Sequence, residues 1–358
     1  MISMSEFNQQ NVLVTGGAGF IGSNLVKIII QSAPAKVVIV DNLLSAERIN
    51  VPEHRAVRFI EGSIADESIL NGLNDEFDYV FHLSTYHGNQ SSIANPLADH
   101  ANNTLTTLKL YERIKNFRKV KKVVYASAGC TVAKKTFDDI KPTTEDDPVS
   151  LVQDSPYAIS KIIGEFYSVY YHKQHNLPTV RARFQNVYGP GEILGAGQWR
   201  GTPATVWRNV IPVFIYKALN QMPLPVENEG RASPDKIGAS RDFIYVEDIC
   251  RGLIACAFKG KAGDVYNLAS GQETTILELA QLINNLTANP AAIESLPRRN
   301  WDNSGRRVGC AVKSSKELQF KAEILLKKGL INTIDWTRQN RSLIQECIDK
   351  HRDHLKHI

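Results

Sequence analysis

The stretch VLVTGGAGFIG, residues Val12 to Gly22, decides the fold of this 358-residue chain. Its first four residues have the apolar and β-branched character of a buried strand, and an amphipathic helical stretch begins at Phe20. Gly16 and Gly19 lie between them, where residues without side chains permit a tight turn and bring the backbone close to a pyrophosphate. The stretch therefore predicts a strand, a turn and a helix that bind a dinucleotide.

A second strand indicates which dinucleotide is bound. The run VVIVDN ends in Asp41, nineteen residues beyond Gly22, and Asn42 follows it. A carboxylate at this point can accept hydrogen bonds from both ribose hydroxyls of the adenosine, and it repels a 2′-phosphate. We therefore expect NAD rather than NADP as the cofactor.

The first half of the chain alternates β-type runs with helical stretches, a pattern typical of a parallel sheet with crossover helices. We expect strands at 11–15, 36–41, 57–61, 79–83, 121–127 and 179–187, and helices at about 20–32, 68–73, 96–116 and 156–175. Residues 1–188 are predicted to form the cofactor domain. Residues 189–358 are predicted to form a smaller lobe that returns to the first domain near 240–260. The Gly-rich loop 191–207 is expected to be a lid that shapes a sugar pocket.

Composition excludes several classes of protein. The five cysteines are odd in number and have no C-x-x-C pair, which argues against a disulfide framework or a zinc site. No apolar signal region opens the sequence, and no apolar run approaches the length of a membrane span. The net charge of +5 is modest and spread along the chain. We expect a cytoplasmic protein with no metal, no nucleic-acid partner and no membrane partner, and a frayed C-terminal tail around His351, His354 and His357.

The run SPYAISK carries a candidate general base. Tyr157 and Lys161 are four residues apart on a predicted helix and therefore project from the same face. A neighbouring ammonium stabilises a tyrosinate and lowers the pKa of the phenol, so that Tyr157 can remove a proton from a sugar hydroxyl. Lys161 can also hold the nicotinamide ribose.

In this order, the motifs resemble those of the extended short-chain dehydrogenases, specifically the NAD-dependent nucleotide-sugar epimerase/dehydratase family with its UDP-glucose 4-epimerase-like members. Further matches are FHLST, ANNTLTTLKLYE, RFQNVYGPG, NVIPVFI, RDFIYVEDI and YNLASG, and the resemblance covers residues 11–320. It implies an α/β fold with a Rossmann-type doubly wound parallel sheet and a smaller α/β substrate-binding lobe. It also implies a homodimer formed through the helices near 96–116 and 156–175.

The resemblance implies a set of cofactor contacts. Ser63 stands where the family has an aspartate beside the adenine, and Gln185 replaces a phenylalanine beside the nicotinamide. Asn103 matches an asparagine that ties the fourth strand region to the active site. The implied contacts are Gly16, Gly19, Phe20, Ile21, Gly22, Asp41, Asn42, Ser63, Ile64, Leu83, Ser84, Thr85, Asn103, Ser127, Tyr157, Lys161 and Gln185.

The same resemblance implies substrate contacts. Asn186 matches a ligand of the substrate diphosphate, and Asn209 and Arg241 match contacts to the nucleotide end. Arg307, or its neighbour Arg306, matches an arginine that clamps the phosphates, although a structural salt bridge is the alternative. The other implied substrate contacts are His87, which could instead be a surface histidine, and Gly129. Arg200 could pair with the carboxylate of a uronic acid, which would suggest an O-antigen or other polysaccharide sugar.

The turn in VVYASAGCTVA, residues 123–133, narrows the reaction. Gly129 aligns with the Ser or Thr that relays a proton in the family, so Thr131 or Ser127 would have to supply the hydroxyl, and Thr131 is our choice. Cys130 is one residue out of register for an acid/base role. Because the turn has no carboxylate, we expect an epimerase, acting at C4 through a transient keto-sugar. A dehydratase or dehydrogenase of the family, and a non-catalytic NAD or sugar-nucleotide-binding protein, are the alternatives.

Overall fold

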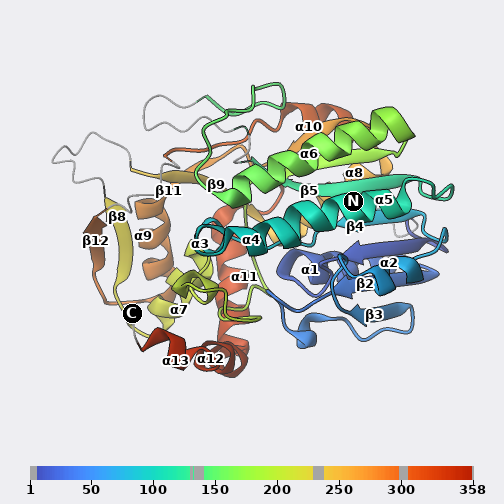
Figure 1. Cartoon of the computed structure of the whole chain (residues 1–358). Coiled ribbons are helices and arrows are strands. Elements are labelled where there is room, and N and C mark those ends of the chain that lie inside the picture. Colours follow the sequence, from blue (N-terminus) through green and yellow to red (C-terminus); the bar gives the residue numbers. More distant parts are fainter. Residues whose placement is uncertain (1–5, 130–131, 133–140, 229–237, 298–304, 357–358) are drawn as a thin grey trace.

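Parallel strands form the central sheet in the computed structural model, which describes residues 6–129, 132, 141–228, 238–297 and 305–356. Across this sheet the order is β10 (Val265–Leu268), β6 (Thr179–Phe184), β5 (Lys122–Ala128), β4 (Tyr79–His82), β1 (Asn11–Thr15), β2 (Lys36–Asp41) and β3 (Val57–Glu61) (Figure 1). The order reverses between β1 and β4, where doubly wound sheets bind ligands at the carboxyl ends of their strands. The predicted Rossmann-type fold is confirmed.

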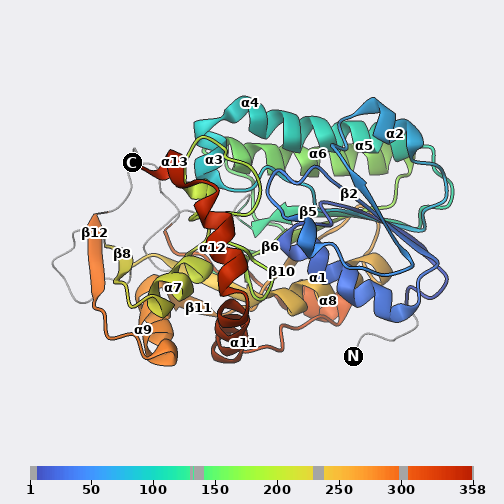
Figure 2. The same cartoon turned by 90° about the horizontal axis from the view of Figure 1, so that it is seen from below.

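Helices cover both faces of this sheet (Figure 2). One face carries α1 (Phe20–Ile29), which continues as the short helix η1 (Ile30–Ser32), and α8 (Val246–Phe258). The other carries α2 (Glu67–Gly72), α4 (Pro96–Asp99), the π-helical segment η3 (His100–Leu105), α5 (Thr106–Ile114) and α6 (Pro156–His175). No helix in the described part of the chain is both long and apolar enough to cross a membrane.

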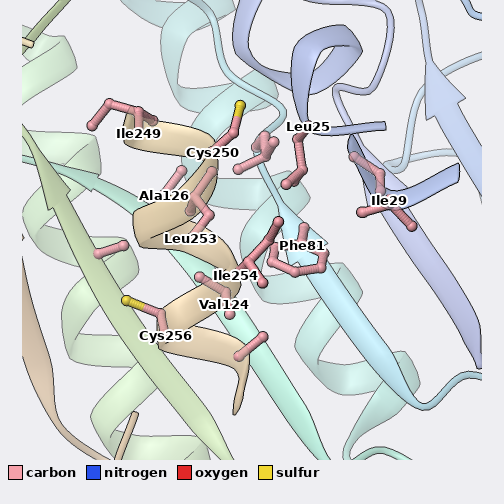
Figure 3. Packing of buried hydrophobic residues seen from close by; sticks show 14 of the residues in the cluster. Leu25, Ile29, Phe81, Val124, Ala126, Ile249, Cys250, Leu253, Ile254 and Cys256 are labelled. Carbon is pink, nitrogen blue, oxygen red and sulfur yellow. The ribbon is translucent and has the colours of Figure 1, made fainter. Parts of the chain in front are cut away.

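A continuous core joins α8 to the sheet (Figure 3). Leu253 and Ile254 of α8 pack against Val124 of β5 and Phe81 of β4, and each of these residues is at most 1% exposed. Cys250 and the other cysteine of this helix, Cys256, are free and buried in the same core, where desolvation raises the pKa of each thiol. They act as small apolar groups rather than as reactive sites.

The second lobe contains two small sheets. One has the order β11 (Glu273–Thr275), β9 (Ser240–Tyr245) and β7 (Asn186–Tyr188), and the other pairs β12 (Ile293–Pro297) with β8 (Leu224–Asn228). The remaining elements are η2 (Arg48–Asn50), α3 (Asn89–Ala94), η5 (Pro203–Thr205), α7 (Val210–Leu219), α9 (Ile276–Thr287), α10 (Val312–Leu318), α11 (Leu326–Gln339), α12 (Arg341–Asp349) and α13 (Arg352–Leu355). The chain returns from this lobe to the first through α8 and β10 (Figure 2).

One predicted strand, 179–187, is two strands in the structure. It breaks at Gln185, after which β7 leaves the central sheet and pairs with β9. The break brings Gln185 and Asn186 to the carboxyl edge of the sheet. Likewise, the predicted helix 96–116 contains the π-helical segment, which turns the buried Asn103 inward.

Residues 189–208, which include the predicted lid 191–207, pack as a wall of the cavity in this structure. Most of this segment is buried, and the backbone of Gly195 and Gly197 lies directly against Cys347 and Leu44, so that a Cβ at either glycine would clash. The predicted frayed tail is wrong at His351, whereas His357 lies outside the described residues. His351 is buried and its Nε2 lies 2.9 Å from the carbonyl oxygen of Gly195, because the wall offers the tail a packing surface.

A buried charge network fixes α6 against the sheet. Glu165 of α6 accepts hydrogen bonds from Arg183 of β6 at 2.8 Å through both of its oxygens, and from Ser127 of β5 at 2.5 Å. Glu165 and Arg183 are each only 4% exposed. Burial alone would raise the pKa of Glu165, but the bonds and charge of Arg183 bring it below the ordinary value.

We expect Glu165→Gln to lower the free energy of unfolding by about 3–5 kcal/mol, because it leaves the guanidinium of Arg183 buried without its counter-ion. Urea titration at pH 7 measures this loss. Since the folded pKa is lowered, the stabilisation is complete above the carboxyl's ordinary value of 4.5 and disappears as the pH falls through the folded value, so that the two proteins converge in acid. The exposed Glu346→Gln is the control, and an equal effect of both changes would contradict the prediction.

Candidate active site

A cavity of about 580 Å³ opens at the carboxyl ends of the strands and extends into the second lobe. Its wall contains the turn after β1, the ends of β2, β4 and β5, the first turns of α6, and the segment that leads into α7. Residues from both lobes therefore face the same space. Its volume lies within the range of about 300–1,000 Å³ that is usual for small-molecule sites.

The glycine turn after β1 is shaped to admit a close ligand. Gly16 has a φ of +75°, and a Cβ there would lie 2.6 Å from the backbone nitrogen of Ser84. A Cβ on Gly22 would lie 2.2 Å from the carbonyl oxygen of Gly16. Gly19 precedes α1 without a side-chain cap, and the first turn of α1 has no acidic residue. The N–H groups of this helix are thus available to an anion.

Asp41 retains capacity to bind a ribose. One carboxylate oxygen accepts from Ala18 N at 3.0 Å and the other from Leu43 N at 2.9 Å. Burial raises the pKa of this carboxyl, and the backbone N–H groups oppose that effect. A carboxylate has about four acceptor positions, so Asp41 keeps acceptor capacity for a ribose hydroxyl. The glycine cradle and Asp41 together fit NAD.

Tyr157 and Lys161 meet at the centre of the cavity wall. Ser155 is the N-cap of α6, and its hydroxyl accepts a hydrogen bond from Ala158 N, while Tyr157 N donates to Ser92 Oγ at 3.1 Å. Lys161 Nζ donates to Ala126 O at 2.9 Å and lies 5.7 Å from the centre of the Tyr157 ring. The ammonium is therefore fixed beside the phenol, between the cofactor turn and the second lobe.

His87 lies against Tyr157, with 6.2 Å between the ring centres. Its Nδ1 is buried and has no hydrogen-bond partner among the described residues. Burial, reinforced by the charges of Arg208, Arg200 and Lys161, lowers the pKa of His87 to about 3. The imidazole is therefore neutral at physiological pH and lines the cavity as a hydrogen-bonding group.

The turn after β5 differs from the predicted arrangement of hydroxyls. The hydroxyl of Ser127 donates to Glu165, so its proton is committed away from the cavity. Gly129 does not line the cavity; an ideal Cβ there would lie 2.3 Å from Nε2 of Gln185. A Cβ on Gly309 would lie 2.6 Å from the same atom. The carboxamide of Gln185 thus occupies a slot between two glycines. Thr131 and Cys130 lie outside the described residues.

At the end of the cavity expected to hold the nucleotide, the structure distinguishes Arg306 from Arg307, the two candidates for a phosphate ligand. The side chain of Arg306 makes two hydrogen bonds to the carboxylate of Glu273, at 2.7 and 2.8 Å. Its backbone forms an isolated β-bridge with Ser240. Arg307 lines the cavity, and its buried Nε has no partner among the described residues. Arg307 is therefore the one positioned to meet a ligand.

Most residues predicted for the site come together in this cavity. Asn103 does not line it: its Oδ1 accepts from Tyr86 N at 2.6 Å, and its Nδ2 donates to Asp99 at 2.7 Å, so it holds the loop after β4 from behind. The predicted residues on the wall are Gly16, Gly19, Phe20, Ile21, Gly22, Asp41, Asn42, Ser63, Ile64, Leu83, Ser84, Thr85, His87, Ser127, Tyr157, Lys161, Gln185, Asn186, Asn209, Arg241 and Arg307.

The sequence reasoning missed Glu192 and Arg208, which also line the cavity. Glu192 is 7% exposed, and one of its oxygens accepts a hydrogen bond from Asn209. Burial raises the pKa of Glu192 to about 7. Both residues lie in the wall segment 189–208, which has no periodic pattern. The adjacency of Arg208 to Asn209 was the one sequence signal that could have pointed to either of them.

Comparisons with known proteins agree with this geometry. The model of the NAD-dependent epimerase/dehydratase family matches residues 12–269. The enzyme WbmF of Bordetella bronchiseptica, solved with NAD+ and UDP, is 58% identical, covers 99% of this chain and 100% of its own, and has a TM-score of 0.87. A putative UDP-glucose 4-epimerase of Methanocaldococcus jannaschii is 30% identical over 92% of this chain and 99% of its own.

A dTDP-glucose 4,6-dehydratase of Actinoplanes is 29% identical over 92% of this chain and 98% of its own. The relatives therefore include both reaction types of the family. The glycine cradle, Asp41 and the match over residues 12–269 lead to one conclusion. The chain belongs to the NAD-dependent epimerase/dehydratase family and is an enzyme with NAD as its cofactor.

Proposed function

We propose that this enzyme is a nucleotide-sugar epimerase that acts at C4 through a transient keto-sugar. The observation that carries the proposal is the single cavity in which Tyr157 and Lys161 stand between the cofactor turn and the second lobe. The residues 127–133 of the β5 turn include no carboxyl group, which disfavours elimination of water at that position. UDP bound to WbmF supports a uridine nucleotide as the carrier of the sugar.

In the proposed reaction, NAD accepts a hydride from the sugar and later returns it to the opposite face. Tyr157 removes the proton from the hydroxyl at the reacting carbon, and the fixed charge of Lys161 favours the tyrosinate. His87, as a neutral imidazole, hydrogen-bonds the sugar beside the phenol. Arg307, Arg241, Asn186 and Asn209 hold the nucleotide diphosphate, so that the released keto-sugar can rotate while it stays tethered.

The proton relay remains part of this proposal. Gly129 has no hydroxyl, and Ser127 directs its own to Glu165. We retain Thr131, which lies outside the described residues, as the candidate for the relay hydroxyl on the sequence alone. Thr131→Val tests it directly, because an unchanged kcat would exclude that role.

The decisive experiment incubates the purified protein with UDP-, dTDP-, GDP- and CDP-sugars. An epimerase yields a product of unchanged mass that separates chromatographically, without accumulation of NADH. A product lighter by one water identifies a dehydratase. Net formation of NADH identifies a dehydrogenase, and binding without any product identifies a sensor.

A dehydratase is the second candidate because of Glu192. This carboxyl is buried, lines the cavity and has a pKa raised to about 7, so it could exchange a proton at neutral pH. Glu192→Gln separates the two functions. It abolishes a dehydration that depends on this carboxyl, whereas C4 epimerisation by Tyr157 persists.

Tyr157→Phe should lower the rate of turnover by about 10²–10⁴-fold and leave NAD binding unchanged, because it removes only the group that transfers the proton. Turnover is measured with the active sugar from the panel, and binding is measured as the nucleotide retained by the folded protein. Tyr167→Phe on the same helix is the matched control. Full activity of the Tyr157 variant would reject the catalytic assignment.

The slot between Gly129 and Gly309 gives a stability prediction. Gly129→Ser displaces the Gln185 carboxamide and should lower the free energy of unfolding by only about 1 kcal/mol, because the flexible end of that side chain can move. Adding Gln185→Ala to the same protein should recover part of this loss, with a coupling of about 0.5 kcal/mol in the double-mutant cycle. Gly72→Ser, where a Cβ has nothing within 4 Å, is the control. Purely additive effects would show that the two positions do not compete for space.

A homodimer is also part of the proposal. Leu97 of α4 and Phe166 of α6 are 80% and 60% exposed, and Ile159 and Tyr170 of α6 extend the same apolar surface. These helices lie side by side on one face of the molecule (Figure 2). An apolar surface of this kind indicates an interface.

Phe166→Glu should convert the dimer to a monomer, because it places a charge in the apolar contact. Light scattering coupled to size-exclusion chromatography measures the mass. Leu277→Glu, at an exposed apolar position on α9, should leave the mass unchanged. Wild-type protein that is already monomeric at micromolar concentration would refute the dimer.

A further inference from the structure

Asp99 is a buried acid behind the cavity wall, at the point where α4 ends and the π-helical segment begins. It is only 1% exposed, and its Oδ1 accepts a hydrogen bond from Asn103 Nδ2 at 2.7 Å. Burial raises the pKa of this carboxyl, and hydrogen bonds from Ser160 and Asn103 oppose that effect. Asp99 does not line the cavity, so any influence on the reaction has to pass through the groups that it holds.

The amide of Asn103 has two ends that face different partners. Its Oδ1 accepts from Tyr86 N at 2.6 Å and from Thr85 Oγ1 at 2.9 Å. Because a backbone N–H can only donate, the oxygen of the amide has to face this loop and the NH2 group has to face Asp99. If the amide turned over, its NH2 group would meet the N–H of Tyr86, and its oxygen would meet the carboxylate. Asp99 therefore favours one orientation of the amide.

The loop that this amide holds carries residues that face the ligands. Ser84, Thr85 and His87 all line the cavity. The ring of His87 lies against that of Tyr157, with 6.2 Å between their centres. A displacement of the loop would therefore change the position of the imidazole relative to the phenol.

The same cluster also reaches the helix that carries Tyr157. Ser160 lies between Tyr157 and Lys161 on α6, and its hydroxyl donates to the carbonyl oxygen of Tyr157 at 3.0 Å. Asn103 Nδ2 lies 3.2 Å from Ser160 Oγ, and Ser160 also contacts the carboxylate of Asp99. The carboxylate therefore stands at the junction between the loop after β4 and the first turns of α6.

We propose that Asp99 is a positioning residue that fixes the orientation of the Asn103 amide. Through that amide it sets the spacing between the rings of His87 and Tyr157. A displacement of about 1 Å at the reacting groups can lower a rate by about 10²-fold, so an acid outside the cavity can control turnover. The inference rests on the proposed role of Tyr157 as the general base, whereas the hydrogen bonds that carry it do not depend on which sugar reacts.

Asp99→Leu and Asp99→Asn test the orientation of the amide. Leucine removes the acceptor, so kcat of the folded enzyme with the active sugar should fall by about 10- to 100-fold. Asparagine can still accept through its side-chain oxygen and should keep kcat near the wild-type value. Calorimetric titration with UDP should give the same affinity for both variants, because the proposed diphosphate ligands lie elsewhere in the cavity. A wild-type kcat for Asp99→Leu would overturn the proposal. An equal loss in both variants would also overturn it, because it would assign the effect to the charge of Asp99.

Exchanging the two side chains tests the same contact even if the leucine variant fails to fold. Asn103→Asp alone places two carboxyl groups against each other and should lower kcat. Adding Asp99→Asn makes position 99 the donor and position 103 the acceptor, which again matches the N–H of Tyr86. The double variant should therefore recover most of the loss, and a double variant no more active than Asn103→Asp would overturn the proposal.

NMR spectra of histidine-labelled protein distinguish a failure of this inference from a failure of the proposed function. The His87 resonance, identified by its loss in His87→Gln, senses the ring of Tyr157 and needs no substrate. It should move in Asp99→Leu and stay in place in Asp99→Asn. If the wild-type protein converts no sugar but the resonance behaves in this way, the proposed function fails and the positioning role stands. An unmoved resonance in Asp99→Leu would overturn the positioning role.

Discussion

The buried ion pair between Glu165 and Arg183 is the constraint on which the site depends. Both side chains are fixed through two parallel hydrogen bonds, so the rotation of α6 about its own axis is set relative to β6. Lys161 stands one turn earlier on α6 and reaches the carbonyl of Ala126 on β5. Tyr157 stands one turn before that and faces the cavity. An apolar pair of the same volume could hold α6 equally firmly, but it would not fix the rotation in this way.

The end of β6 shapes the turn after β5. Because β6 stops at Phe184 and β7 joins another sheet, Gln185 bends over the turn and fills the space beside Gly129. Gly309, from a distant part of the chain, clears the other side. A side chain at position 129 would therefore displace the carboxamide of Gln185 from this space.

The sequence predicted those elements whose bounds are set by interactions between residues that are close in the chain. The bounds of β1, β2, β3 and α6 followed from apolar runs, glycines and the Ser155 cap, and the resemblance identified the residues of the glycine turn. Periodicity missed α3 and the π-helical segment at Asn103, whose geometry depends on bonds to Tyr86 and Asp99. Side chains of adjacent residues on an extended backbone point to opposite sides, so Arg306 and Arg307 meet different partners. The sequence does not show which of them reaches the cavity, because that depends on Glu273, which pairs with Arg306.

Tertiary packing explains why the wall segment could not be read from sequence. Its glycines suggested mobility, yet Gly195 and Gly197 are small because Cys347 and Leu44 lie against them. His351 adds a bond from the C-terminal helices to the carbonyl oxygen of Gly195, so this side of the cavity takes its shape from residues more than 150 positions downstream. No local pattern within residues 189–208 contains that information, because the partners that fix the backbone lie in other parts of the chain.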